Sequence, residues 1–248
     1  MTDVATTTTT PPPLTALVTG ATSGLGQAIA LRLARDGMRV IVVGRDPARG
    51  AAVVEQIETE GGQARFIAAD LSDPADIERL AVEAGDIDVL VNNAGFSLWA
   101  PTEKVAVEEF DAMFASNVRA PFLLVGKFAP AMAAKGAGSI INISSMAGRI
   151  GLPNGAAYGA TKAALASLAQ SWTAEYSPRG VRVNAVAAGP IYTRPEARQL
   201  FDRLGDTTAL HRAAEPSEIA EVVAFLASPQ ASYMTGAIVA ADGGRTAI

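Results

Sequence analysis

The chain has 248 residues, of which 49% are hydrophobic and 18% are charged, and its formal net charge is −5. This apolar fraction is typical of a globular protein with a substantial core and excludes an intrinsically disordered chain. The acidic balance argues against nucleic acid as a partner, and the lack of cysteine excludes disulfides and a catalytic thiol.

The first 13 residues, MTDVATTTTTPPP, predict a flexible N-terminal tail, because runs of Thr and Pro cannot bury enough apolar surface to offset the entropy of ordering. They lack the positive charge and the apolar run of a signal peptide. The chain also lacks a stretch of about 18 apolar residues that could cross a membrane. We therefore expect a soluble, cytoplasmic protein without a membrane partner, in which residues 14–248 form a single domain.

After the tail, short runs rich in β-branched residues alternate with longer stretches of helical periodicity. In the first of these longer stretches, Leu25, Ile29 and Leu33 form an apolar stripe, and Gly37 follows as a signal for the helix end. Seven strands joined by helical connections predict an α/β fold, a Rossmann-like, doubly wound parallel sheet with helices on both faces. The predicted strands are 15–19, 39–43, 64–69, 87–91, 139–144, 181–186 and 237–241.

A glycine-rich segment, TGATSGLG at 19–26, lies between the first predicted strand and the first predicted helix. Glycines at such a turn let the backbone approach a pyrophosphate, whose charge the helix N-terminus favours. The spacing differs from the usual G-x-G-x-x-G fingerprint, so glycines that serve only tight helix–strand packing remain an alternative. The predicted cofactor contacts in this segment are Gly20, Thr22, Ser23, Gly24, Leu25 and Gly26.

The ends of the next three strands predict the adenosine side of a dinucleotide site. After the second strand come Gly44 and Arg45, where an acidic residue would bind a ribose hydroxyl and an arginine would bind a 2′-phosphate. This favours NADP(H), with NAD(H) as the alternative. Asp46 weakens the preference, and an ordinary surface role for Arg45 stays open. The predicted lining of the adenine pocket is Asp70, Leu71, Asn93, Ala94 and Gly95.

Three polar residues at and after the end of the fifth predicted strand occur in an order that suits proton transfer. Ser145 ends that strand, Tyr158 comes 13 residues later, and Lys162 lies one helical turn beyond Tyr158. A tyrosine with its usual pKa of about 10 is a poor base at neutral pH. A nearby ammonium, together with the positive end of a nicotinamide, should lower that pKa. We therefore expect Tyr158 to exchange a proton with a substrate oxygen held by Ser145, while hydride moves to or from carbon.

The blocks TGATSGLG, DIDVLVNNAG, SSMAG, YGATK and DGG occur in the order and approximate spacing of one known family. From about residue 14 to residue 244 the sequence resembles the classical short-chain dehydrogenase/reductase family, in particular its 3-oxoacyl-carrier-protein reductase-like branch. The resemblance implies Ser145, Tyr158 and Lys162 as catalytic residues. Tyr158 and Lys162 are also expected to contact the cofactor. The resemblance also implies that Asn117 relays protons through water to the lysine.

The resemblance extends to the last third of the chain. Gly189, Ile191 and Thr193 are expected to contact the cofactor, although Ala188 stands where the family usually has the proline of a Pro-Gly pair. Residues 190–213 are expected to form a mobile lid over the substrate, and we predict no catalytic role for His211, the only histidine. The resemblance further implies a homotetramer, formed through helices at about 103–134 and 156–176 and the C-terminal strand.

The sequence thus predicts an oxidoreductase that transfers hydride between a nicotinamide cofactor, preferably NADPH, and a small ketone or secondary alcohol. Two alternatives are a catalytically silent NAD(P)-binding regulatory protein and a reductase specific for 3-oxoacyl chains on a carrier protein. No His, Cys and carboxylate cluster has metal-ligand spacing, so no metal is expected.

Overall fold

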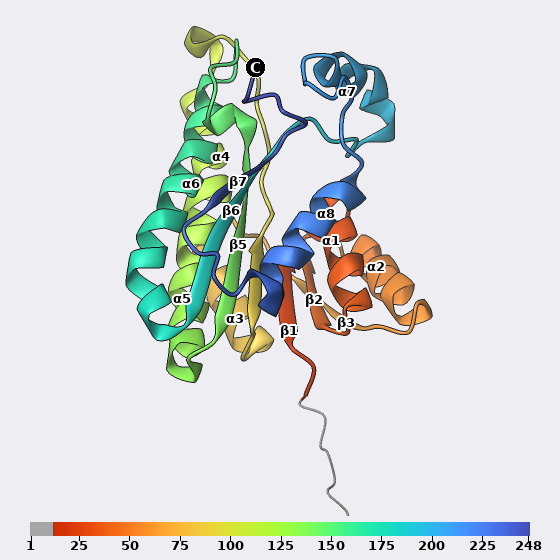
Figure 1. Cartoon of the computed structure of the whole chain (residues 1–248), viewed down its shortest axis with the longest axis vertical. Coiled ribbons are helices and arrows are strands. Elements are labelled where there is room, and N and C mark those ends of the chain that lie inside the picture. Colours follow the sequence, from red (N-terminus) through yellow and green to blue (C-terminus); the bar gives the residue numbers. More distant parts are fainter. Residues whose placement is uncertain (1–11) are drawn as a thin grey trace, which may run out of the picture.

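Seven parallel strands form one sheet in the order β3-β2-β1-β4-β5-β6-β7 (Figure 1). The computed structural model describes residues 12–248, so the predicted tail at 1–13 lies almost wholly outside the described residues. All seven predicted strands are confirmed, with ends that differ from the expected ones by at most two residues. The strands are β1 (Thr15–Thr19), β2 (Arg39–Gly44), β3 (Gln63–Ala68), β4 (Val89–Asn92), β5 (Gly138–Ser145), β6 (Val181–Ala188) and β7 (Ile238–Ala241).

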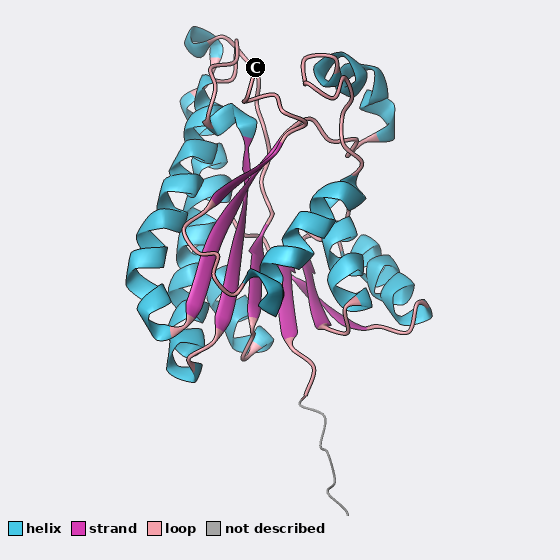
Figure 2. Ribbon diagram, viewed as in Figure 1, coloured by secondary structure: helices cyan, strands magenta, loops and turns pink. Residues whose placement is uncertain are grey.

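Helices cover both faces of the sheet, because the strands are apolar on both sides (Figure 2). In β1, Ala16 and Val18 pack into the core on one face and Leu17 into the core on the other. The first face is covered by α1 (Gly24–Arg35), α2 (Pro47–Thr59) and α8 (Pro216–Ala227). The second face is covered by α3 (Pro74–Ala84), α5 (Ala120–Lys135) and α6 (Ala156–Tyr176).

The helix expected at 103–134 is interrupted by a wider turn. Helix α4 (Val107–Phe114) continues into a π-helical turn, Ala115–Arg119, and then into α5. Such turns are frequent at functional sites. Here the turn holds Asn117 fully buried, whereas a regular surface helix would expose a polar residue at many such positions.

The strand order reverses beside β1. The chain runs from β1 outward to β2 and β3, and then returns to place β4 on the other side of β1. The loops that leave β1 and β4 therefore diverge, and ligands of such sheets bind in the crevice between them. A short helix, α7 (Arg198–Gly205), lies beyond this end of the sheet (Figure 1). No helix within residues 12–248 has both the length and the apolar character to cross a membrane.

Candidate active site

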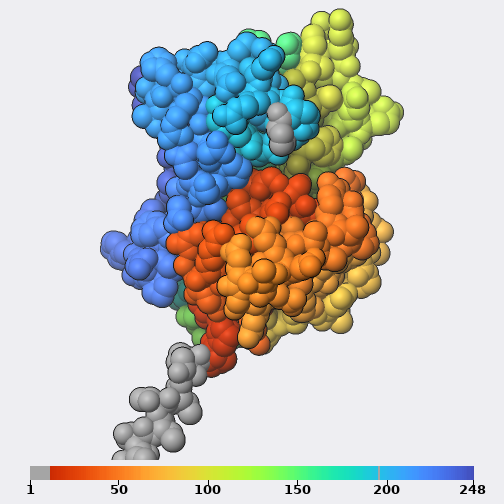
Figure 3. Space-filling model, turned by 90° about the vertical axis from the view of Figure 1, so that its right-hand side faces the viewer, coloured from red at the N-terminus to blue at the C-terminus, as the bar shows by residue number. Residues whose placement is uncertain are grey.

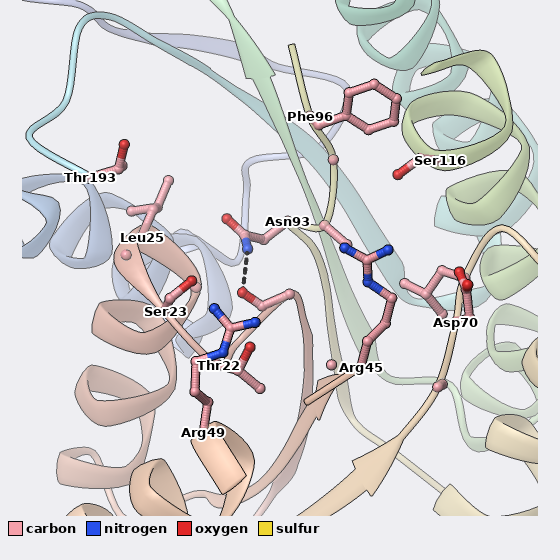
Figure 4. A pocket seen from close by; sticks show the side chains of 18 of the residues that line it. Thr22, Ser23, Leu25, Arg45, Arg49, Asp70, Asn93, Phe96, Ser116 and Thr193 are labelled. Carbon is pink, nitrogen blue, oxygen red and sulfur yellow. Dashed lines mark hydrogen bonds between the residues drawn. The ribbon is translucent and has the colours of Figure 1, made fainter. Parts of the chain in front are cut away.

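A cavity of about 610 Å³ lies at the carboxyl ends of the strands around this reversal (Figure 4). Its wall brings together most of the cofactor contacts predicted from the sequence, namely Gly20, Thr22, Ser23, Gly24, Leu25, Gly26, Arg45, Asp70, Leu71, Asn93, Ala94, Gly95 and Thr193. It also contains residues that the sequence analysis did not assign to a cofactor, namely Gly44, Arg49, Ala69, Ser72, Phe96, Ala112, Ser116 and Arg194.

The glycine turn after β1 serves packing and the cavity together. A Cβ on Gly26 would lie 2.2 Å from the carbonyl oxygen of Gly20 and 2.5 Å from Nδ2 of Asn93, so only glycine fits there. Gly20 and Gly24 have φ angles of 63° and 54°, which side chains disfavour. The packing role that the sequence left as an alternative is therefore real for Gly26, but the turn also forms the cavity wall.

Hydrogen bonds join this turn to the end of β4. Thr19 Oγ1 accepts hydrogen bonds from the backbone amides of Asn93 and Ala94, both at 3.0 Å, and donates to the carbonyl of Val91 at 3.2 Å. The Asn93 side chain donates from Nδ2 to the carbonyl oxygen of Thr19 at 2.9 Å. The two loops that border the crevice are thereby held in a fixed relation to each other.

The N-terminus of α1 opens into the cavity. Ser23 precedes the helix in an extended conformation, and within the described residues its side chain makes no capping bond to the first turn. The first amides of a helix lack partners within the helix and attract anions. Thr193 covers this end, with its carbonyl oxygen 3.4 Å from the position of a Cβ on Gly24. This arrangement suits a pyrophosphate.

The opposite end of the cavity is lined by two arginines and a carboxylate. Oδ1 of Asp70 accepts hydrogen bonds from the backbone amide of Ser72 at 3.0 Å and from its hydroxyl at 2.8 Å. These bonds, helped by the charge of Arg45, lower the pKa of Asp70, so its carboxylate stays ionised. Arg49 was missed because its position on a helix, rather than after a strand, gave no signal in the strand-end pattern.

The three residues proposed for proton transfer meet beyond the end of β5. The Ser145 hydroxyl lies close enough to Tyr158 to favour the ionised form of its phenol. Nζ of Lys162 lies 5.7 Å from the centre of the Tyr158 ring and donates to the carbonyl oxygen of Ile143 at 2.9 Å. A Cβ on Gly95, which lines the cavity, would lie 3.6 Å from Nζ of Lys162, so the group borders the cavity.

The pKa of Tyr158 differs from the expectation. Burial raises the pKa of this phenol, and the nearby Ser145 hydroxyl offsets that rise only in part. Burial also lowers the pKa of Lys162 to about 8. The predicted lowering of the tyrosine pKa relied on the charge of a bound nicotinamide as well as on the lysine. In the protein alone the pKa of Tyr158 is instead raised, because loss of hydration disfavours the charged form of the phenol.

The side chain of Asn117 clamps the loop that follows β4. Its Oδ1 accepts from the amide of Phe96 at 3.0 Å, and its Nδ2 donates to the carbonyl of the same residue at 2.9 Å. Nδ2 also donates to Oγ1 of Thr161 at 3.1 Å, and that hydroxyl donates to the carbonyl of Tyr158 at 2.7 Å. Asn117 thus connects the π-helical turn, the cavity loop and the helix that carries Tyr158 and Lys162.

Four predicted cofactor contacts do not line the cavity, namely Tyr158 and Lys162, which lie at its border, and Gly189 and Ile191. A Cβ on Gly189 would lie 2.7 Å from Cα of Asp242, and the Gly189 amide donates to the carbonyl of Ala241 at 3.0 Å. Ile191 is buried and forms an isolated bridge with Ala214. In this structure Gly189 and Ile191 have packing roles, and of the contacts expected at 189–193 only Thr193 reaches the cavity wall.

The segment 190–213, coloured cyan to blue in Figure 3, lies over the red and orange N-terminal elements that form the cavity floor. Its α7 is tied to its own start, because the Tyr192 hydroxyl donates to Asp202 at 2.6 Å and Arg198 stacks 4.5 Å above the Tyr192 ring. His211 is exposed and lies 3.4 Å from the carbonyl oxygen of Asp206. Among residues 12–248, no three His, Cys, Asp or Glu side chains are grouped to hold a metal ion.

Known proteins match both the sequence and this arrangement. A family model described as enoyl-(acyl carrier protein) reductase matches residues 20–246. The chain is 37% identical to the 3-oxoacyl-[acyl-carrier-protein] reductase FabG of Staphylococcus aureus, over 92% of this chain and 96% of that one.

Two solved structures superpose on nearly the whole chain. One, described as a short chain dehydrogenase/reductase family protein, gives a TM-score of 0.90 at 46% identity and covers 95% of this chain and 98% of its own. The other is a blue fluorescent protein from a metagenomic library in complex with NADPH. It gives a TM-score of 0.87 at 35% identity and covers 94% of this chain and 97% of its own. The chain therefore belongs to the classical short-chain dehydrogenase/reductase family, NAD(P)-dependent oxidoreductases that act on CH–OH and C=O groups.

Proposed function

We propose that the chain is an NADPH-preferring carbonyl reductase that also oxidises the corresponding secondary alcohols. The observation that carries this proposal is the meeting of Ser145, Tyr158 and Lys162 at the border of the cavity. A catalytically silent NAD(P)-binding protein would have no need of a buried ammonium beside a buried phenol, because both are costly to keep out of water.

The cavity wall fits a nicotinamide dinucleotide. The first amides of α1 and Thr193 would hold the pyrophosphate, and the strand-end residues Asp70, Leu71 and Asn93 would line the adenosine half. When bound, the nicotinamide ring supplies or accepts the hydride.

The side chains at the border supply the proton. Because burial raises its pKa, Tyr158 stays protonated at neutral pH, and a neutral phenol is the form that can donate a proton to a carbonyl oxygen. Ser145 holds the same oxygen by a hydrogen bond. Lys162, anchored on the carbonyl of Ile143, keeps a positive charge next to the phenol and stabilises the phenolate that forms when the proton leaves.

The preference for NADPH is supported by the end of β2. Gly44 has no carboxylate to bind a ribose 2′-hydroxyl, and Arg45 lines the cavity where a 2′-phosphate would lie. The relative solved with NADPH is consistent with this choice.

The substrate class is open between two candidates. The Staphylococcus aureus relative favours a 3-oxoacyl chain on a carrier protein. The half-exposed Trp99 ring, 5.7 Å from the ring of Tyr158, favours a free ketone with a bulky apolar group that packs against it. We also propose that residues 14–248 act as one domain with 190–213 as its lid, and that the protein is a cytoplasmic homotetramer.

Cofactor oxidation tests this function directly. The purified chain should consume NADPH faster than NADH on a panel of ketones and 3-oxoacyl thioesters. Tyr158→Phe should lower kcat at least about 100-fold, with the dissociation constant for NADPH within twofold of wild type. Tyr176→Phe, on the same helix but stacked on Arg179, is the matched control and should keep full activity. Full activity in Tyr158→Phe would refute the assignment.

A further inference from the structure

The adenosine end of the cavity carries a second arginine besides Arg45. Arg49 lies in the first turn of α2, and both arginines belong to the cavity wall. In Figure 4 the side chain of Arg49 lies next to Thr22, and that of Arg45 lies closer to Asp70. Two cations from different elements thus flank one end of the cavity.

Asp46 determines how Arg49 is presented. Asp46 is the N-cap of α2, and its Oδ1 accepts hydrogen bonds from the backbone amides of Ala48 at 3.0 Å and of Arg49 at 3.1 Å. Its other carboxylate oxygen, Oδ2, accepts a hydrogen bond from Nε of the Arg49 side chain at 2.8 Å. An arginine bound through Nε keeps its two terminal nitrogens for another acceptor, in a fixed fork geometry. The carboxylate that weakened the NADP(H) prediction is therefore occupied in orienting a cation.

Thr22 fills the position beside the end of β2. A Cβ on Gly44 would lie 2.5 Å from Cγ2 of Thr22 and 3.0 Å from its Oγ1. A carboxylate side chain at position 44, which would bind a ribose 2′-hydroxyl, therefore cannot be built while Thr22 keeps its place.

We propose that Arg49, oriented by Asp46, is a second ligand for a 2′-phosphate beside Arg45. Thr22, packed against Gly44, is the residue that excludes an NAD-selecting carboxylate from position 44. This inference rests on the proposed preference for NADPH and adds two features to it. The attractive device is Arg49, which would bind the 2′-phosphate, and the repulsive device is Thr22, which would exclude a carboxylate at position 44. Asp46 acts as a positioning residue, since it reaches the phosphate only through Arg49.

Binding of two small probes tests the attractive device without turnover. Titration calorimetry on the full chain would compare 2′,5′-ADP, which carries the 2′-phosphate, with 5′-AMP, which lacks it. Arg49→Gln should raise the dissociation constant for 2′,5′-ADP about tenfold and leave that for 5′-AMP unchanged. Arg35→Gln is the matched control, because Arg35 is similarly exposed and ion-paired, with Glu60, but does not line the cavity. Asp46→Asn keeps a capping oxygen and should weaken 2′,5′-ADP two- to threefold only when Arg49 is present.

The outcomes separate this inference from the function on which it rests. Equal binding of both probes by the wild-type chain would overturn the NADPH preference itself, and this inference with it. A wild-type preference that survives in Arg49→Gln but is lost in Arg45→Gln would overturn the role of Arg49 alone. For the repulsive device, Gly44→Asp should not improve NADH binding by itself, whereas Gly44→Asp with Thr22→Ala should. Improved NADH binding in the single variant would overturn the role of Thr22.

Discussion

Lys162 is a buried cation, and its burial makes the stability of the protein depend on pH. Burial lowers its pKa from 10.5 to about 8, while the unfolded chain keeps the ordinary value. Between these two values the unfolded state binds more protons, so the contribution of Lys162 to stability rises with pH through this window. Below about pH 8 the full cost of burying the charge is present.

Lys162→Met should therefore be inactive yet more stable at pH 7, with the free energy of unfolding raised by roughly 1–3 kcal/mol. Urea unfolding should show this advantage shrinking as the pH rises from 8 to 10.5. Lys127→Met, which removes an exposed lysine paired with Glu78, should change stability little at either pH. A Lys162→Met protein that is less stable than wild type at pH 7 would show that the lysine is not a net cost to the fold.

At the scale of elements, the π-helical turn is joined to two other parts of the site by the side chain of Asn117. Asn117→Ala would leave the amide and the carbonyl of Phe96 without these partners. We expect kcat to fall at least about tenfold, because a small misplacement of catalytic groups has effects of this size or larger. Hydrogen–deuterium exchange at the Phe96 amide should become faster.

Thr161→Val is the comparison for this clamp. It removes one acceptor of Asn117 but leaves both bonds to Phe96, so its effects on kcat and on exchange should be smaller. If Asn117→Ala lost activity while the Phe96 amide exchanged at the wild-type rate, the clamp would not explain the loss. The proton relay implied by the family resemblance would then be the better account of Asn117.

The elements were predictable because parallel strands buried on both faces must be apolar along most of their length. Most of the cavity wall followed, since residues directly after such strands have little freedom to lie elsewhere. Arg49 and Ser116 were not predictable in this way, because the rotation of a helix about its axis is set by packing. The spacing of Tyr158 and Lys162 gave their proximity but not their burial, which controls the direction of both pKa shifts. Gly189 was expected at the cofactor by resemblance, whereas here it packs against Asp242.

At the scale of the whole molecule, two exposed phenylalanines lie on helices that cover opposite faces of the sheet. Phe122 is 53% exposed on α5, and Phe225 is 42% exposed on α8, which packs on the opposite face of the sheet. Aromatic side chains are enriched in subunit contacts. Two such faces on one chain support the proposed tetramer, because two different two-fold contacts generate a closed assembly of four subunits.

Phe122→Glu should therefore convert the tetramer into dimers joined through α8, and Phe225→Glu should yield dimers joined through α5. The double variant should be a monomer. A glutamate in either contact would be buried without a partner, which costs more than a contact of a few aromatic side chains can offset. Analytical ultracentrifugation would measure the masses, with Val82→Glu on α3 as the control, because Val82 is 84% exposed and belongs to neither α5 nor α8. A monomeric wild-type chain would refute the tetramer. Dissociation of Val82→Glu would instead show that added charge, rather than the position of the side chain, separates the subunits.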